Sequence, residues 1–301
     1  MGQGALAARD MNLEISHRTT YAYRTPVAQS HHMVHLKPRT TPSQTVLHHS
    51  LLIEPAPVSQ TEITDVFGNG AALLRIKEEH TEFIVHARST VATTASPPPA
   101  LDVGTAWEDI AESENWQRLP IDIDARQFVC RSRHAAASRE IKAFALQSFP
   151  PHRPVLAGVY HLTRRIFEEF AFDPRATDVS TPISRVLEMK RGVCQDFAHL
   201  AIAAVRSIGL PARYVSGYLM TRPPPGQVKL KGADASHAWL SVWAPELGWV
   251  DFDPTNGIVP SGEHITVAYG RDYDDISPIT GVLLGGGEQT MSVAVDVEAV
   301  G

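Results

Sequence analysis

Cys194 is the residue whose surroundings point most directly to chemistry. It lies in the segment KRGVCQDFAHL, shortly after Gly192 and at the start of a run with apolar residues at helical spacing. The thiolate is the nucleophilic form of cysteine, and the N–H groups at a helix N-terminus favour it. The same N–H groups can donate to a carbonyl oxygen under attack. Cys194 is therefore predicted to be a nucleophile; the alternative is a small buried hydrophobe. The other cysteine, Cys130, lies in an ordinary helical context and is predicted to be a packing residue.

A base for this nucleophile is predicted in the segment SHAWLSVWAPELGWVDFDP, residues 236–254. Its pattern indicates two strands joined by a short turn near Glu246, so residues whose numbers sum to about 492 face each other. Asp253 then lies diagonally across from His237 on the same face, within reach of its side chain. Asp251 shares that face but lies further along the strand. Asp253 is the predicted orienting partner, and Asp251 is the alternative.

Together these residues have the composition of a nucleophilic triad. Asp253 would fix the tautomer of His237, which would hold the Cys194 thiolate as an ion pair and then protonate the leaving amine. Gln195 and Asp196 flank the nucleophile and are predicted to contact substrate, although either could simply cap the helix. Trp239 is predicted to line an acyl-binding cleft, with burial in the core as the alternative.

No metal or cofactor is predicted. The histidines of the N-terminal region lack the paired spacing of a zinc site: His31, His32, His35, His48 and His49. Asp272, Asp274 and Asp275 are closely spaced, but no glycine and distal glutamate complete a calcium loop. Both groups are interpreted as structural or solvated side chains.

The composition excludes several classes of partner. The 301 residues carry a net charge of −6 with no basic stripe, so nucleic acid is not an expected partner. No apolar run approaches the roughly 18 to 20 residues that a membrane span needs, and no membrane association is expected. The first residues lack the apolar core of a secretory signal, so the expected location is cytoplasmic. The sequence gives no prediction of the oligomeric state.

The pattern of elements predicts an α+β chain with two domains. Short alternating segments within residues 12–92, with the turn signal DVFGNG between two of them, indicate an N-terminal antiparallel β-sandwich-like domain over 11–95. The stretch ATTASPPPALDVG cannot continue a central strand and opens a predicted linker over 96–120. Apolar residues at helical spacing follow, and then strands, so 121–301 is predicted to be the catalytic domain.

Three sequence blocks resemble the transglutaminase-like superfamily. They are GVCQDFAHLAIAAVRSIGLPARYVSGYL, SHAWLSVWAPELGWVDFDPTN and, near the C-terminus, RDYDDISPITGVLLGGG; the segments TYAYRTPVAQSHHMVHLKPR and DVFGN are similar to the β-rich domain that precedes the core in many bacterial members. The resemblance implies a papain-like core in which helices pack on an antiparallel sheet. It also implies that Cys194 is the nucleophile, His237 the base and Asp253 the aspartate.

The expected activity is acyl transfer through a thioester on Cys194, with a peptide or other amide as substrate. Hydrolysis is favoured slightly over transfer to an amine, because water is always present. Transglutaminase or amide synthase activity is the alternative within this class. A non-catalytic binding or scaffold protein on the same fold is the alternative from another class, and the complete triad argues against it.

Overall fold

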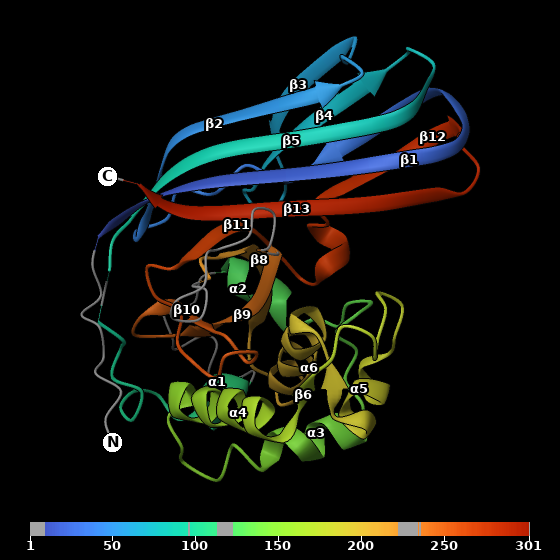
Figure 1. Cartoon of the computed structure of the whole chain (residues 1–301). Coiled ribbons are helices and arrows are strands. Elements are labelled where there is room, and N and C mark those ends of the chain that lie inside the picture. The colour runs from blue at the N-terminus through green and yellow to red at the C-terminus, as the bar shows by residue number, and fades with distance from the viewer. Residues whose placement is uncertain (1–9, 96, 113–122, 222–233, 235, 301) are drawn as a thin grey trace, which may run out of the picture.

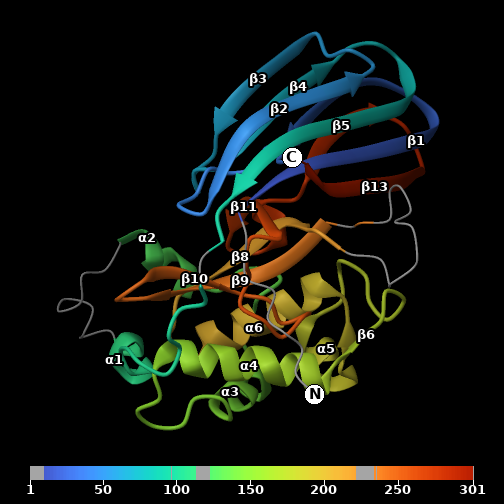
Figure 2. The ribbon, with the colours of Figure 1, turned by 60° about the vertical axis from the view of Figure 1, so that its left-hand side comes forward.

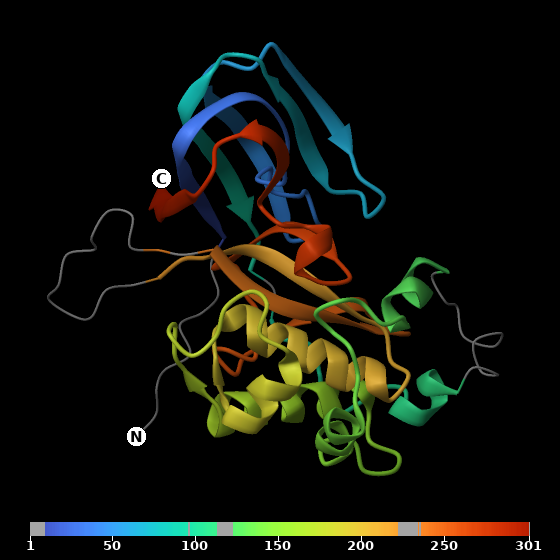
Figure 3. The ribbon, with the colours of Figure 1, turned by 90° about the vertical axis from the view of Figure 1, so that its right-hand side faces the viewer.

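The computed structural model describes residues 10–95, 97–112, 123–221, 234 and 236–300. Two antiparallel sheets and a group of helices form three layers, with the larger sheet above, the smaller sheet in the middle and the helices below (Figure 1). The view from the right-hand side shows the same order of layers (Figure 3). This arrangement confirms the predicted α+β fold class, with a β-rich N-terminal part.

The larger sheet contains five N-terminal and two C-terminal strands, all in antiparallel pairs. The N-terminal strands are β1 (Met11–Val34), β2 (Gln44–Glu54), β3 (Ser59–Thr64), β4 (Gly70–Ile76) and β5 (His80–Thr93). Their order is β2-β5-β1-β4-β3. The C-terminal strands β12 (Ile279–Gly285) and β13 (Gln289–Val300) both pair with β1.

The long strand β1 divides this sheet into two halves. Its first half pairs with β5 and β13, and its second half pairs with β4 and β12. One hydrophobic cluster contains buried side chains from both halves, among them Val34, Leu74, Phe83 and Val85. The halves therefore pack on each other through a shared core, and the sheet curls visibly when the molecule is turned (Figure 2).

The C-terminal strands depart from the predicted domain limits. The prediction placed all of 121–301 in the catalytic domain, whereas β12 and β13 complete the sheet of the N-terminal domain. An unpaired strand leaves a row of backbone N–H and C=O groups without partners, and pairing with β1 satisfies them. Val295 and Val297 are buried in the same core cluster as Leu13 and Ile15 of β1. The strand that a terminal strand pairs with is set by the tertiary fold. The apolar and polar pattern of the terminal strand does not predict it.

The described part of the predicted linker is attached to the catalytic domain. It contains the short helix α1 (Trp107–Ala111). The Thr105 N–H and hydroxyl donate to Glu246 Oε1, at 2.8 and 2.6 Å, and Trp107 Nε1 donates to the carbonyl of Pro150 at 3.1 Å. Residues 113–120 of the predicted linker lie outside the described residues.

The catalytic domain pairs a four-stranded antiparallel sheet with helices. The strand order is β10 (Gly248–Phe252), β9 (Ser236–Ala244), β8 (Ala212–Leu219) and β11 (His264–Gly270). The principal helices are α3 (Arg139–Leu146), α4 (Val155–Glu169), α5 (Ile183–Met189) and α6 (Cys194–Ser207). Shorter elements are α2 (Ile123–Arg126), β6 (Ala171–Phe172) and β7 (Arg191–Gly192). Of the helices within the described ranges, none has the length and apolar character needed to cross a membrane.

Helix α6 lies at the centre of this domain because most of its residues are apolar. Every residue from Asp196 to Arg206 is buried. A helix that is hydrophobic on all sides packs against neighbours on all sides. The central position of α6 fixes its first residue, Cys194, beside the sheet.

The N-terminal domain supports the free edge of the smaller sheet. The Gln44 side chain accepts from Thr266 N at 2.9 Å and donates to Thr266 O at 2.8 Å. Asn69 makes the same pair of bonds with Tyr269, at 2.8 Å each. Two side-chain amides thus make the backbone hydrogen bonds that a fifth strand would otherwise make along β11. Strand β11 begins at His264.

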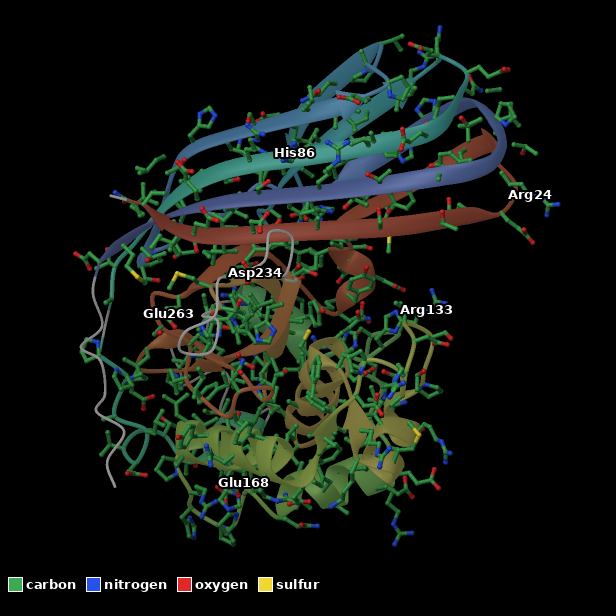
Figure 4. All side chains as sticks on the ribbon, viewed as in Figure 1. Arg24, His86, Arg133, Glu168, Asp234 and Glu263 are labelled. Carbon is green, nitrogen blue, oxygen red and sulfur yellow. The ribbon has the colours of Figure 1, made fainter. Side chains whose placement is uncertain are left out.

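The end of β13 is tied to the catalytic domain through Asp234. This residue lies just below β13 (Figure 4). Its N–H donates to the carbonyl of Val295 at 3.0 Å, and its Oδ2 accepts from Val297 N at 2.9 Å. Asp234 also accepts from the Thr221 hydroxyl. These contacts anchor the chain three residues before His237.

Candidate active site

The backbone before Cys194 is held by a buried carboxylate. Asp196 Oδ2 accepts from Val193 N at 2.8 Å and from the Thr177 hydroxyl at 2.6 Å. A Cβ atom at Gly192 would lie 2.7 Å from this same oxygen, so only glycine permits the approach. The carboxylate therefore fixes the point at which α6 begins and the direction of the Cys194 side chain.

This geometry decides between the two interpretations of Asp196. The side chain is 6% exposed and already accepts two hydrogen bonds, as a capping residue does. Burial raises the pKa of Asp196, and the hydrogen bonds from Thr177 and Val193 oppose that shift. The structure thus places Asp196 in a capping role, with its carboxylate directed at the backbone before Cys194. Gln195 is half-buried next to Cys194.

The hairpin that carries the base has the predicted register. Asp251 pairs with Ser241 and Gly248 pairs with Ala244, so the numbers of paired residues sum to 492. His237 Nε2 lies 2.7 Å from Asp253 Oδ2. Asp251 instead accepts from Trp239 Nε1 at 2.9 Å. Of the two candidate carboxylates, the structure brings Asp253 to His237.

His237 connects Asp253 to Cys194. Cys194 is the other group that acts on its imidazole, and since Nε2 is engaged with Asp253, Nδ1 is the nitrogen left for the sulfur. Burial alone would lower the pKa of His237. The hydrogen bonds to Asp253 and Cys194, together with the charges of both, overcome that effect and raise the pKa to about 10. The site therefore favours an imidazolium beside the sulfur at neutral pH.

Asp253 is a fully buried carboxylate with donors on both oxygens. Oδ1 accepts from the backbone N–H groups of Thr255 and Asn256, at 2.9 and 3.2 Å. Oδ2 accepts from His237, from Asn256 Nδ2 at 2.7 Å and from His264 Nε2 at 3.0 Å. Burial would raise the pKa of Asp253, but the hydrogen bonds and charges of the two histidines hold it well below its usual range.

The structure corrects the prediction for Trp239. Its side chain is 0% exposed, and its indole N–H is engaged with Asp251. The ring lies against Gly217, where an added Cβ would come within 2.5 Å of it. A side chain with no exposed surface cannot line an open cleft, so Trp239 belongs to the core. Large aromatic side chains dominate core burial, which is why the alternative interpretation prevailed.

Three residues of this network had no predicted role: Thr177, Asn256 and His264. Asn256 directly follows the DPT segment, and its place in the motif DPTN was a signal that could have identified it. Thr177 and His264 lie on other segments, 19 and 11 residues away from their carboxylate partners. No periodicity or spacing in the sequence connects such pairs.

The donor atoms around Asp253 are also of the kinds that bind metals. Nε2 of His237, Nε2 of His264 and an oxygen of Asp253 lie within 4.8 Å of one another. The two nitrogens, however, point at the same oxygen at 2.7 and 3.0 Å, which are the lengths of ordinary N–H···O bonds. Hydrogen bonding therefore accounts for this cluster.

A cavity of about 720 Å³ opens between the two domains. Its wall includes Arg39, Arg213, Asp251 and His264, but neither Cys194 nor His237. The guanidinium carbons of Arg39 and Arg213 lie over the ring of Tyr269, at 4.7 and 3.5 Å from its centre. This cavity borders the residues that support the triad and does not contain the nucleophile.

Both parts of the chain match described families. Residues 13–92 match the bacterial transglutaminase-like N-terminal region, and residues 143–254 match the transglutaminase-like superfamily. An uncharacterized protein of Mycobacterium tuberculosis is 36% identical over 288 residues, which cover 94% of this chain and 91% of that protein. A protein-glutamine gamma-glutamyltransferase of Pseudomonas aeruginosa is 33% identical over 102 residues, which cover 33% of this chain and 15% of that protein.

A solved structure shares the whole fold. It is a protein of Cytophaga hutchinsonii that is provisionally described as a cysteine protease. The two structures have a TM-score of 0.76 with 23% sequence identity, and the match covers 98% of this chain and 92% of the other. The likeness includes the N-terminal sheet as well as the domain that carries Cys194.

Proposed function

The chain belongs to the transglutaminase-like superfamily, and we propose that it is a cysteine-dependent acyl-transfer enzyme acting on amide or peptide carbonyls. The observation that carries the proposal is the position of His237, which hydrogen-bonds the buried carboxylate of Asp253 and whose pKa is raised by both Asp253 and Cys194. A nucleophile, a base and a group that orients the base are the three parts that covalent acyl transfer requires.

The proposed reaction follows from these positions. The Cys194 sulfur attacks the carbonyl carbon, and N–H groups in the first turn of α6, which have no partner within the helix, are the proposed donors to the oxyanion. The carbon–nitrogen bond breaks as His237 gives its proton to the leaving nitrogen, and a thioester remains. A water molecule or an amine then attacks the thioester, His237 takes the proton from it, and the thiolate leaves.

Hydrolysis is the outcome we favour slightly, because water is always available to attack the thioester. Transfer to an amine is the close alternative. It is supported by the partial similarity to the gamma-glutamyltransferase, which extends over a third of this chain. The two outcomes share every step up to the thioester and differ only in the group that attacks it.

Alkylation with iodoacetamide at neutral pH is expected to modify Cys194 at least about tenfold faster than Cys130. Cys130 is exposed and Cys194 is half-buried, so exposure alone predicts the reverse order. The pKa of His237 is raised to about 10, which keeps a cation beside the Cys194 sulfur at neutral pH. Peptide mapping by mass spectrometry over time gives both rates in one sample.

The matched control is His237→Gln, which removes the cation and keeps a polar side chain. The advantage of Cys194 should disappear in this variant. Faster labelling of Cys130 in the unaltered protein would favour the non-catalytic scaffold and would contradict the proposed function.

A further inference from the structure

We propose that His264 is a positioning residue of the active site: its Nε2–H group fixes the carboxylate of Asp253, which in turn orients His237. The proposal rests on the proposed function and adds a residue that supports the triad from outside it. His264 lies on β11, whereas His237 lies on β9 and Asp253 directly follows β10.

The geometry around Asp253 singles out His264. Of the donors to this carboxylate, Thr255 and Asn256 belong to the turn that directly follows Asp253. Within the described part of the chain, the side chain that reaches Asp253 from a separate strand, apart from the base His237, is His264, at 3.0 Å. It holds the same oxygen, Oδ2, that accepts from His237. The position of that oxygen is therefore set from a strand outside the hairpin.

The hydrogen-bonding pattern fixes the tautomer of His264. An ionised carboxylate only accepts, so Nε2 of His264 must carry the hydrogen. Nδ1 of His264 is buried and has no hydrogen-bond partner among the described residues. A proton on Nδ1 would be buried without an acceptor, which disfavours it. The neutral ring with hydrogen on Nε2 satisfies the site.

His264 is itself held in place. Its side chain is 3% exposed, and its ring meets the buried Trp239 edge to face at a centroid distance of 5.2 Å. Two residues further along β11, Thr266 is bound through both backbone groups to Gln44 of the N-terminal domain. The N-terminal domain thus supports the strand that positions Asp253. This gives the β-rich domain a part in the geometry of the site.

Two nearly isosteric substitutions test the proposal. His264→Gln keeps an N–H donor that can reach Asp253, whereas His264→Met has a similar size and flexibility but no donor. The readout is the iodoacetamide rate of Cys194 as a function of pH, with Cys130 as the internal reference. His32→Met, which replaces another buried histidine far from the triad in the N-terminal domain, controls for general loss of packing.

The Met variant is expected to lower the rate at neutral pH by about tenfold and to shift the acid limb of the profile upward by about one pH unit. The shift is upward because an Asp253 carboxylate that is less well oriented stabilises the His237 imidazolium less, so the Cys194 thiolate beside it forms only at higher pH. The Gln variant should stay within a factor of about three of the unaltered protein. The His32→Met protein should keep the original profile.

Two results would overturn the proposal. One is a Met variant with the original profile; the other is an equal loss in the Gln and Met variants, which would assign the effect to packing. If the Met variant does not fold, nitrogen-15 NMR of the unaltered protein with labelled histidines determines the tautomer of His264. The His264 signals are identified by their loss in the Gln variant. Hydrogen on Nε2 at neutral pH supports the proposal, and hydrogen on Nδ1 overturns it. Failure of the unaltered protein to label Cys194 selectively would instead count against the proposed function.

Discussion

Replacing Cys194 with alanine is expected to abolish acyl transfer, with a loss in turnover on the order of 10⁵ or more. The sulfur forms the covalent bond to the acyl group, so the variant has no group on which the thioester can form. The fold should persist, because the start of α6 is fixed by Asp196 and not by the thiol. Hydrolysis of p-nitrophenyl acetate gives the turnover, and circular dichroism gives the fold.

Cys130→Ala is the matched control for that experiment. Cys130 is exposed and lies outside the triad, so its loss should change turnover by less than a factor of about two. Full activity in the Cys194→Ala protein, with the fold intact, would exclude the thioester mechanism.

Asp253→Asn is expected to lower turnover by about 10⁴-fold, by analogy with the loss seen when the aspartate of a serine triad becomes asparagine. The change keeps the shape of the side chain but replaces an acceptor with an amide. Five N–H groups point at the two oxygens of Asp253, so one end of the amide must face donors. His237 then loses the partner that fixes its tautomer and stabilises its charge.

Asp251→Asn provides a control with the same chemistry two residues away. Its carboxylate accepts from Trp239 Nε1, and an asparagine carbonyl can still accept that bond. Turnover should fall by less than about tenfold. The comparison is made on kcat for both variants. A nearly normal Asp253→Asn protein beside an inactive Asp251→Asn protein would refute the assignment of the triad.

The relation of His237 to Asp253 could be predicted because it is local. Both residues lie on one hairpin, its turn sets the register, and side chains alternate with a period of two along each strand. The predicted pairing of Asp251 with Ser241 is present in the structure. The helix that starts at Cys194 was equally visible, because apolar spacing and the preceding glycine are local signals.

The contacts that could not be predicted join segments far apart in the chain. β12 and β13 pair with β1, which lies more than 200 residues earlier in the chain. Their own sequences do not indicate which strand they pair with. Trp239 illustrates a different limit: its pattern fits both a cleft and a core. Its burial depends on the close approach of Gly217 from the neighbouring strand β8. His264 reaches Asp253 from β11, a strand that pairs with β8 and is bound by Gln44 of the N-terminal domain.

The most direct test of the central claim is to identify the residue that carries the acyl group. The protein is mixed with p-nitrophenyl acetate, quenched in acid within the first turnover and analysed by intact mass and peptide mapping. One acetyl group on the peptide that contains Cys194, absent from the Cys194→Ala protein, is the result we predict. Acetylation that is equal on Cys130, or absent from Cys194 while p-nitrophenol is still released, would contradict a thioester mechanism at this site.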